Sequence, residues 1–461
     1  MPVDADQKIT HVLDRLSLGA RPGDRAKINK TGIDAYIQSQ VKPANETEPN
    51  ALAERLKGLS TLSLSPLALF KGAALPKNPS EAQKKKASDW RQQVIKETEQ
   101  ARLLRAMESP HQLREMMVDF WFNHFNVFVH KDLTAVWLGH YEQSAIRAHA
   151  LGKFRDLLGA TVKHPAMLFY LDNWRNTDPN SVGAKGPFKG LNENYARELM
   201  ELHTLGANGG YSQADVESLT KTLTGWSVVH NQQPSTEENG FVFAADRHDS
   251  SIKKLLGKTL LGQGVEEGDR ALDLLASHPA TARHISYKLA QFFVADEPPT
   301  TLVSRLAEQF LATQGDIAET LLALFESSEF WEAAYYQRKF KTPYQYLLSM
   351  VRAMGVSAPS PEVLTRLGGL MNQLGMPLYR CQTPNGYAQT EVAWLSPDVM
   401  MRRVSMAIAT TNIVRGNKPD PAVLLTTLEN QLTAADRGLI DDAPKPLQAA
   451  LMLGSPSMMY R

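Results

Sequence analysis

The chain has 461 residues, and its 50 lysines and arginines balance 49 aspartates and glutamates to a formal net charge of +1. Because the positive and negative charges nearly cancel, the protein has no overall electrostatic field that would attract nucleic acid. We therefore expect no nucleic-acid partner. No apolar run approaches the roughly 20 residues that a membrane-spanning helix needs, so we expect no membrane span. The single cysteine, Cys381, excludes a disulfide within the chain and a zinc site built from cysteines.

The N-terminal part of the chain predicts helices and an irregular covering segment. Residues 7–42 contain two short amphipathic segments around an Arg-Pro-Gly-Asp turn, and residues 43–80 are rich in proline and small residues. A lysine triplet at 84–86 then opens a charged helix that reaches about Met107. The start, MPVDADQKIT, has neither the basic nor the apolar region of a signal peptide, so we expect no signal peptide in this chain.

Residues 109–190 predict aromatic-rich helices followed by a long polar loop. The stretch MMVDFWFNHFNVF and an amphipathic segment at about 133–158 indicate two helices, and HPAMLFYLDNW leads into a polar loop at 175–190. Loops of that length in a compact domain tend to be functional or disordered. We therefore expect this loop to form one wall of a site, with Asp172 and Asn173 at its start.

The stretch from 191 to 226, LNENYARELMELHTLGANGGYSQADVESLTKTLTGW, predicts a helix, a glycine turn and a second helix. Asn192 is a residue type that begins helices well. Gly206 suits a C-cap with positive φ. Ser212, with Asp215 three residues further on, is typical of a capping box that opens the second helix.

The first of these two helices is expected to bury one face and to present carboxylates on the other. At 3.6 residues per turn, Tyr195, Leu199 and Leu202 share a face. The other side carries Asn194, Glu198 and Glu201, with Arg197 beside them. His203 and the distant His124 lie among apolar neighbours, and we expect both to be hydrogen-bonded core histidines.

The remaining segments complete a mainly α-helical fold, which we predict to be a large array of helices with long loops and at most one small β-hairpin between residues 228 and 262. Further helices are expected at 279–294, 300–314, 317–335, 343–354, 361–374, 397–414 and from 447. We divide the chain into an N-terminal helical covering region (1–108), a core helical domain with the polar motif (109–345) and a C-terminal helical region packed on the core (346–461). The expected core includes Phe120, Leu168, Tyr195, Leu199, Leu202, Trp226 and Phe292.

Several long motifs resemble the bacterial family catalogued as domain of unknown function 1800. They are HVLDRLSLGARPGD, FWFNHFNVF, MLFYLDN, LNENYARELMELHTLGANGGYSQADV with LTGW, HDSSIKKLLG, HPATARHISYKLAQFFV and GMPLYRCQTPNGYAQTEVAWLSPD. The resemblance covers nearly the whole chain and implies no settled activity. It implies a periplasmic or extracellular location and an exported partner similar to the phosphatase and sulfatase superfamily. This chain departs from exported members in its lack of a signal peptide.

Glu198 and Glu201 are the leading candidates for acid–base chemistry. They are three residues apart on one helical face, which is close enough for coupled carboxylates or for shared metal ligation. The alternative is a structural carboxylate face in which Arg197 or a neighbouring helix supplies the positive charge. Neither a phosphate-binding glycine loop nor a nucleophile elbow or a His-Glu-x-x-His helix occurs in the sequence.

Other candidate site residues surround this helix in the sequence. Asp172 and His248 are candidate catalytic groups, and both fall where a loop begins or runs. Candidate substrate-binding residues are the polar side chains Asn173, Asn194 and Arg197 and the aromatic platforms Trp121, Trp174 and Trp226. The sequence identifies no cofactor and no metal.

Three functions remain open. The first is an acid–base hydrolase acting on an extracytoplasmic carbohydrate or other polyhydroxyl substrate, because glycoside hydrolysis uses two carboxyl groups about 5 to 9.5 Å apart and aromatic rings suit sugar faces. The second is a metal-dependent oxidoreductase or hydrolase with carboxylate and histidine ligands from several helices. The third is a non-catalytic partner of an exported phosphatase-like or sulfatase-like protein.

Overall fold

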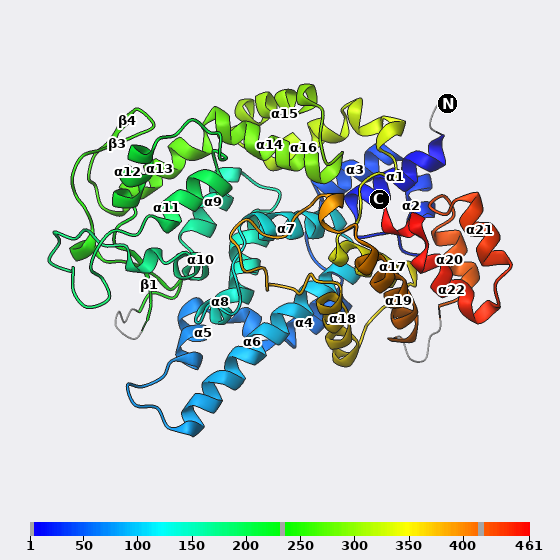
Figure 1. The fold of residues 1–461 in the computed structure, drawn as a ribbon, viewed down its shortest axis with the longest axis horizontal. Helices are drawn as coiled ribbons and strands as arrows, with labels where there is room; N and C mark the ends of the chain where they lie inside the picture. The colour runs from blue at the N-terminus through cyan, green and yellow to red at the C-terminus, as the bar shows by residue number, and fades with distance from the viewer. Residues whose placement is uncertain (1–3, 231–235, 414–418) are drawn as a thin grey trace.

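The computed structural model describes residues 4–230, 236–413 and 419–461. Within these ranges the chain forms 22 α-helices and two antiparallel two-stranded sheets, which confirms the predicted mainly α-helical fold. The middle of the chain lies at one end of an elongated body, and the N-terminal and C-terminal helices lie together at the other end (Figure 1). Each helix in the described ranges is too short or too polar to cross a membrane.

The N-terminal region contains more helices than its amphipathic pattern suggested. Its helices are α1 (Ala5–Leu16), α2 (Asp24–Thr31), α3 (Ile33–Val41), α4 (Asn50–Lys57), α5 (Pro66–Ala73) and α6 (Glu81–Glu108). Three helices, not two, occupy residues 5–41, because Gly23 and Gly32 adopt φ values of +92° and +86° that interrupt helical winding.

The central region carries two π-helical segments among short α-helices. Its elements are α7 (Gln112–His124), α8 (Thr134–His140), the π segment η2 (Tyr141–Ile146), α9 (Phe154–Val162), α10 (Pro165–Tyr170), α11 (Asn194–Glu198), the π segment η5 (Leu199–His203) and α12 (Gln213–Thr222). The single helix expected at 133–158 is therefore interrupted. Ser144 contributes to the interruption, since its hydroxyl donates to the carbonyl of His140 at 2.7 Å and competes with regular helical bonding.

The region expected to hold one hairpin forms two small strand pairs. In the first, β1 (Trp226–Val228) pairs with β2 (Phe241–Phe243), so that Trp226 lies opposite Phe243. In the second, β3 (Lys253–Leu255) pairs with β4 (Lys258–Leu260). Residues 231–235 of the expected hairpin lie outside the described residues.

Helices also dominate the second half of the chain. They are α13 (Val265–Ala276), α14 (Pro279–Phe293), α15 (Thr300–Ala312), α16 (Ile317–Phe325), α17 (Pro343–Ala353), α18 (Pro361–Gln373), α19 (Pro397–Ile413), α20 (Pro421–Thr427), α21 (Ala434–Asp441) and α22 (Lys445–Gly454). Between α18 and α19 a long segment, residues 374–396, runs back to α7, where the Asn123 amide donates to the carbonyl of Tyr387 at 2.8 Å (Figure 1).

A buried charge network fixes this long segment to the core. The guanidinium of Arg102, on α6, donates to Asp119 of α7 at 2.6 Å and to Glu142 of η2 at 2.9 Å. The Tyr379 hydroxyl, from residues 374–396, donates to the same Glu142 carboxylate at 2.7 Å. Because buried charges are costly unless they are paired and hydrogen-bonded, this arrangement holds the four elements in one relative position.

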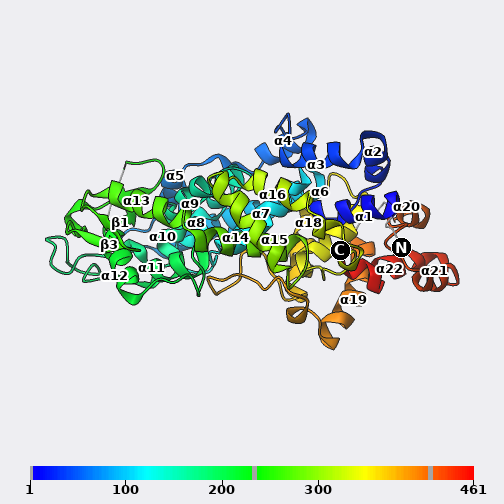
Figure 2. The ribbon, with the colours of Figure 1, turned by 90° about the horizontal axis from the view of Figure 1, so that it is seen from above.

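The two ends of the chain pack together. Gln431, between α20 and α21, donates to the buried carboxylate of Asp14 on α1, and Phe340 pairs with Tyr460 as an isolated antiparallel bridge. In both views α1 and α2 lie at the same end of the body as α20, α21 and α22 (Figure 2). The first helix is therefore anchored by the last part of the chain.

The predicted core is buried, with one exception. Phe120, Leu168, Tyr195, Leu199, Trp226 and Phe292 are at most 4% exposed. Leu202 is only half-buried. The expected face assumed continuous α-helical winding, but the chain changes to π winding at Leu199, which turns Leu202 away from the face of Tyr195 and Leu199.

Candidate functional site

The central helix–turn–helix has the predicted capping box on its second helix, but its first helix, α11, starts at Asn194 with Glu193, and not Asn192, at the N-cap. The side-chain oxygen of Asn192 accepts from the backbone N–H of Asn194 at 3.1 Å. Gly206 has a φ of +82°. Ser212 and Asp215 form a capping box at the start of α12. The new feature is the π segment η5, which directly follows Glu198. π-Helical segments are rare in proteins as a whole, and those that occur are often at functional sites.

The arginine that precedes Glu198 in the chain pairs with another carboxylate. Arg197 donates from Nη2 to Glu193 at 3.0 Å and to Gln213 at 2.9 Å. Among the described residues, no lysine or arginine nitrogen lies within 4 Å of the Glu198 carboxylate. Burial, and then the neighbouring carboxylate of Glu201, raise the pKa of Glu198 above its ordinary value, and Arg197 opposes them only in part.

Tyr170 is hydrogen-bonded to the segment 374–396, and its pKa responds to the charge of Glu198. The Tyr170 hydroxyl, at the end of α10, donates to the carbonyl of Gln382 at 2.8 Å. Burial raises the pKa of Tyr170, and the charges of Cys381 and Glu198 raise it further. The Asn126 amide donates to the carbonyls of Cys381 and Thr383 at 3.0 and 2.9 Å and holds this segment in place.

Asp172 lies next to this group and has the cationic partner that Glu198 lacks. Its carboxylate is 2.6 Å from the Lys131 ammonium, and that ammonium is 6.0 Å from the centre of the Tyr170 ring. Asp172 adopts a φ of +61°, which a short polar side chain tolerates and which ends α10. We call Asn126, Lys131, Tyr170, Asp172 and Glu198, with Glu201 beside Glu198, the polar site.

Two predicted binding residues hold the backbone near the polar site. Asn173 is 1% exposed, and its amide donates to the carbonyls of Leu223 and Trp226 at 3.2 and 2.9 Å. The Asn194 amide donates to the carbonyl of Leu171 at 3.1 Å and joins the start of α11 to the end of α10. Both amides position the elements that carry Asp172 and Glu198.

The predicted polar loop packs mainly on residues 245–247. The amide of Asp178 donates to the carbonyl of Arg247 at 2.9 Å, and the amide of Gly183 donates to the carbonyl of Asp246 at the same distance. The Arg247 guanidinium lies 4.1 Å from the centre of the Phe188 ring. These contacts place the loop beside the short helical turn at 245–247 and not over Glu198.

His248 belongs to a different buried cluster. Its Nδ1 lies 2.9 Å from the carbonyl of Thr224, and its Nε2 lies 3.3 Å from the carboxylate of Glu267. The Lys253 ammonium is 3.0 Å from the same carboxylate. The structure therefore brings His248 together with Lys253 and Glu267, near β3 and α13, and not with Glu198.

The three tryptophans expected to be sugar platforms are enclosed. Trp121 and Trp226 are 0% exposed, and Trp174 is 8% exposed. The Trp121 indole donates to the carbonyl of Ala150 at 3.0 Å, and Trp174 stacks on Phe169 with ring centres 5.2 Å apart. None of the three presents an open ring face to a ligand in this conformation.

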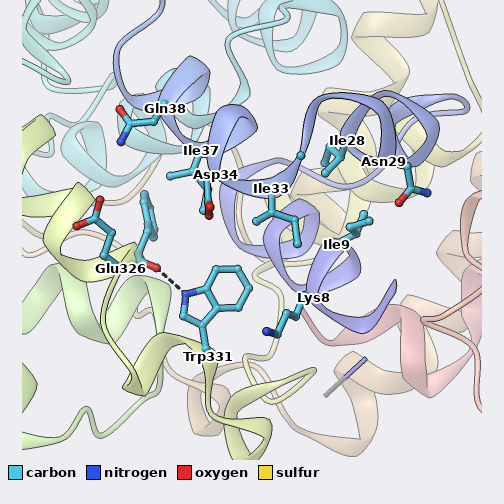
Figure 3. A pocket seen from close by; sticks show the side chains of 12 residues that line it. Lys8, Ile9, Ile28, Asn29, Ile33, Asp34, Ile37, Gln38, Glu326 and Trp331 are labelled. Carbon is cyan, nitrogen blue, oxygen red and sulfur yellow. Dashed lines mark hydrogen bonds between the residues drawn. The ribbon is translucent and has the colours of Figure 1, made fainter. Parts of the chain in front are cut away.

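An accessible tryptophan lies instead in the largest cavity described, which has a volume of about 780 Å³. Trp331 is half-buried there, with Lys8 beside it, Ile9 and Ile33 on one side and Glu326 on the other (Figure 3). The cavity lies among α1, α2, α3 and the end of α16, separate from the polar site. Sequence reasoning missed it because the wall residues come from segments about 300 positions apart.

The described residues contain no group of three or more histidines, cysteines, aspartates and glutamates arranged to hold a metal ion. Glu198 and Glu201 therefore have no histidine ligand beside them in that part of the chain. The geometry of the described residues therefore offers no set of metal ligands for the alternative function, a metal-dependent oxidoreductase or hydrolase.

Comparison with known proteins gives a family and no activity. A family model described as "Protein of unknown function (DUF1800)" matches residues 11–460. The chain belongs to this family. No curated protein and no solved structure shows a significant match. The match covers nearly the whole chain, from the second half of α1 onward and including the polar site, and the chemistry has to be inferred from the residues themselves.

Proposed function

We propose that the protein is an acid–base hydrolase, with Glu198 as its general acid, that acts on a carbohydrate or another polyhydroxyl substrate. The observation that carries the proposal is the environment of Glu198, which is half-buried, close to a second carboxylate and without a cation within 4 Å among the described residues. A general acid needs a raised pKa, so that it still holds its proton near neutral pH.

The neighbouring groups suit the other roles in such a reaction. Glu198 would protonate the leaving oxygen as its bond to carbon breaks, and Glu201 would take a proton from the attacking water as the new carbon–oxygen bond forms. Carboxyl groups in different environments are a recurring way to separate acid from base. Asp172, paired with Lys131, and the hydroxyl of Tyr170 would orient the substrate hydroxyls.

The proposal is tested with a panel of nitrophenyl glycosides and reduced oligosaccharides, with and without Glu198→Gln. We expect measurable hydrolysis by the wild type and a loss of about 100-fold or more in the variant, as for removal of a general acid. Glu193→Gln is the matched control, because Glu193 lies five residues earlier and is paired with Arg197. Equal activity of Glu198→Gln and wild type, on any substrate that is cleaved, would exclude Glu198 as the acid.

The periplasmic or extracellular location implied by the family resemblance is part of this proposal, because polymeric carbohydrate substrates lie outside the cytoplasm. Cell fractionation of the native protein is the corresponding measurement. We expect the protein in the periplasmic fraction or in the medium. Recovery of the protein only with cytoplasmic markers would contradict the proposal that its substrate is extracytoplasmic.

A further inference from the structure

A second cavity, of about 370 Å³, lies between α14 and the turn that follows η5. Its wall includes Gly206, Ala207, Ala280, Arg283, His284 and Val303. The volume is within the roughly 300 to 1,000 Å³ typical of small-molecule sites. None of the residues of the polar site lines it, so it is a separate cavity.

The polar groups around this cavity carry positive charge without a matching carboxylate. Arg283 and His284 belong to its wall, and Lys288 follows one turn later on α14. The Lys288 ammonium is 2.9 Å from Nδ1 of His124. Within the described ranges, no aspartate or glutamate oxygen lies within 4 Å of the charged groups of Arg283 or Lys288. Arg283 is exposed at the mouth of the cavity, whereas Lys288 lies behind its wall, where burial desolvates its ammonium. Because a desolvated charge is normally paired, the positive charge of Lys288 behind the wall favours an anion in the cavity.

The hydrogen bonds show which histidine nitrogens are available. Nε2 of His124 lies 3.1 Å from the carbonyl of His203, so it carries the hydrogen, and Nδ1 accepts from Lys288. Nε2 of His284 likewise lies 3.3 Å from the carbonyl of Leu202. Its Nδ1 is left beside Gly206, where an added methyl group would be only 3.0 Å away. The glycine therefore keeps the wall open at the one protonatable nitrogen of His284.

Burial and the nearby Lys288 lower the pKa of His284 to about 4, and burial lowers the pKa of Lys288 to about 8. At neutral pH Lys288 is therefore mostly charged and His284 is neutral. A bound anion would favour the protonated imidazole, so the site can add a second hydrogen-bonding cation when its ligand arrives.

We propose that this cavity binds a small organic carboxylate with an apolar body. The carboxylate pairs with Arg283 and with Nδ1 of His284, while the apolar part packs on Ala280 and Val303. The first turn of α15, which supplies Thr300 and Val303 to the wall, adds free backbone N–H groups near the same end. The apolar lining favours such an acid over a free inorganic anion.

The test is calorimetric titration of the full chain at pH 7 with benzoate, with its neutral analogue benzamide and with inorganic phosphate. We expect benzoate to bind with a dissociation constant below about 1 mM, at least tenfold tighter than either of the others, since tenfold corresponds to about 1.4 kcal/mol. Arg283→Gln should weaken benzoate at least tenfold. Arg270→Gln, an exposed arginine on α13 outside the cavity, should leave binding unchanged.

A second variant keeps the test decisive if Arg283→Gln alters the fold. Ala207 is exposed at the rim, so Ala207→Trp should fill the mouth and abolish benzoate binding with little effect on the core. Equal binding of benzoate and benzamide would overturn the charge recognition. Binding of phosphate but not benzoate would overturn the apolar ligand class, and binding of none of the three would overturn the site.

Discussion

The Arg197 guanidinium donates to the carboxylate of Glu193 at 3.0 Å, and within the described ranges no lysine or arginine nitrogen lies within 4 Å of the adjacent Glu198. Sequence distance alone favours a pair between Arg197 and Glu198, but neighbouring helical residues point in different directions, whereas residues four apart lie on the same face. Glu198 is consequently free of the structural role that an ion pair would give it.

Replacement of Glu198 by glutamine should therefore leave stability nearly unchanged. We expect a free energy of unfolding within about 0.5 kcal/mol of the wild type, as for surface positions without a defined partner. Thermal and urea denaturation measure this directly. A large fall in melting temperature would show that the carboxylate stabilises the fold and that this helix face has a structural role.

Leu199→Ala should destabilise the protein by about 2–5 kcal/mol, because Leu199 is 0% exposed and its truncation leaves a cavity. Leu202→Ala is the matched control on the same π segment. Leu202 is half-buried, so its truncation should cost clearly less. Equal losses for the two variants would show that the π winding does not separate their environments.

Arg102→Met should be among the most damaging single substitutions. It leaves the carboxylates of Asp119 and Glu142 buried without their cation, and breaking such a network costs about 3–5 kcal/mol. Arg91→Met, on the same helix, removes an exposed pair with Asp132 and should cost about 0–1 kcal/mol. Urea denaturation of both variants compares them, and a loss below about 1 kcal/mol for Arg102→Met would contradict the role of the network.

Asp14 should make the protein less stable as the pH rises. Burial raises the pKa of Asp14 from 3.8 to about 6, against the opposing effect of nearby cations. Between these values the folded state holds a proton that the unfolded state has lost, so the contribution of Asp14 is fully present below pH 3.8 and is lost as the pH rises to 6. The loss is about 3 kcal/mol, since each pKa unit corresponds to about 1.36 kcal/mol.

The measurement is the free energy of unfolding between pH 3.5 and 7 for the wild type and Asp14→Asn. The variant should lack this part of the pH dependence, and the difference between the two curves isolates Asp14 from other titrating groups. Asp34→Asn, at an exposed position on α3, is the control. Parallel curves for wild type and Asp14→Asn would contradict the raised pKa.

Local signals predicted local structure well. The capping box of Ser212 and Asp215, the positive φ of Gly206 and the burial of Tyr195 and Leu199 all follow from short-range chemistry that the sequence displays. Leu202 departs from the pattern because the helix continues with π winding, which no propensity of the individual residues announces.

The candidate site was harder to predict, because its members meet only in three dimensions. Tyr170 contacts Gln382, 212 positions away, and Asn126 contacts Cys381, 255 positions away. The buried tryptophans show a related limit, since composition identifies an aromatic side chain but not whether the core encloses it. Glu198 stays a prediction that the sequence could make, because the neighbouring carboxylate of Glu201 lies three residues away.

The hydrogen bond between Gln431 and Asp14 joins residues 417 positions apart. During translation at about 5–20 residues per second, the Asp14 carboxylate therefore waits roughly 20 to 80 s for its amide partner. Until then α1 can pack on α2, α3 and α7, but the buried Asp14 carboxylate remains without the amide that donates to it. We expect newly made chains to depend on chaperones in that interval, and C-terminally truncated chains to aggregate instead of folding in part.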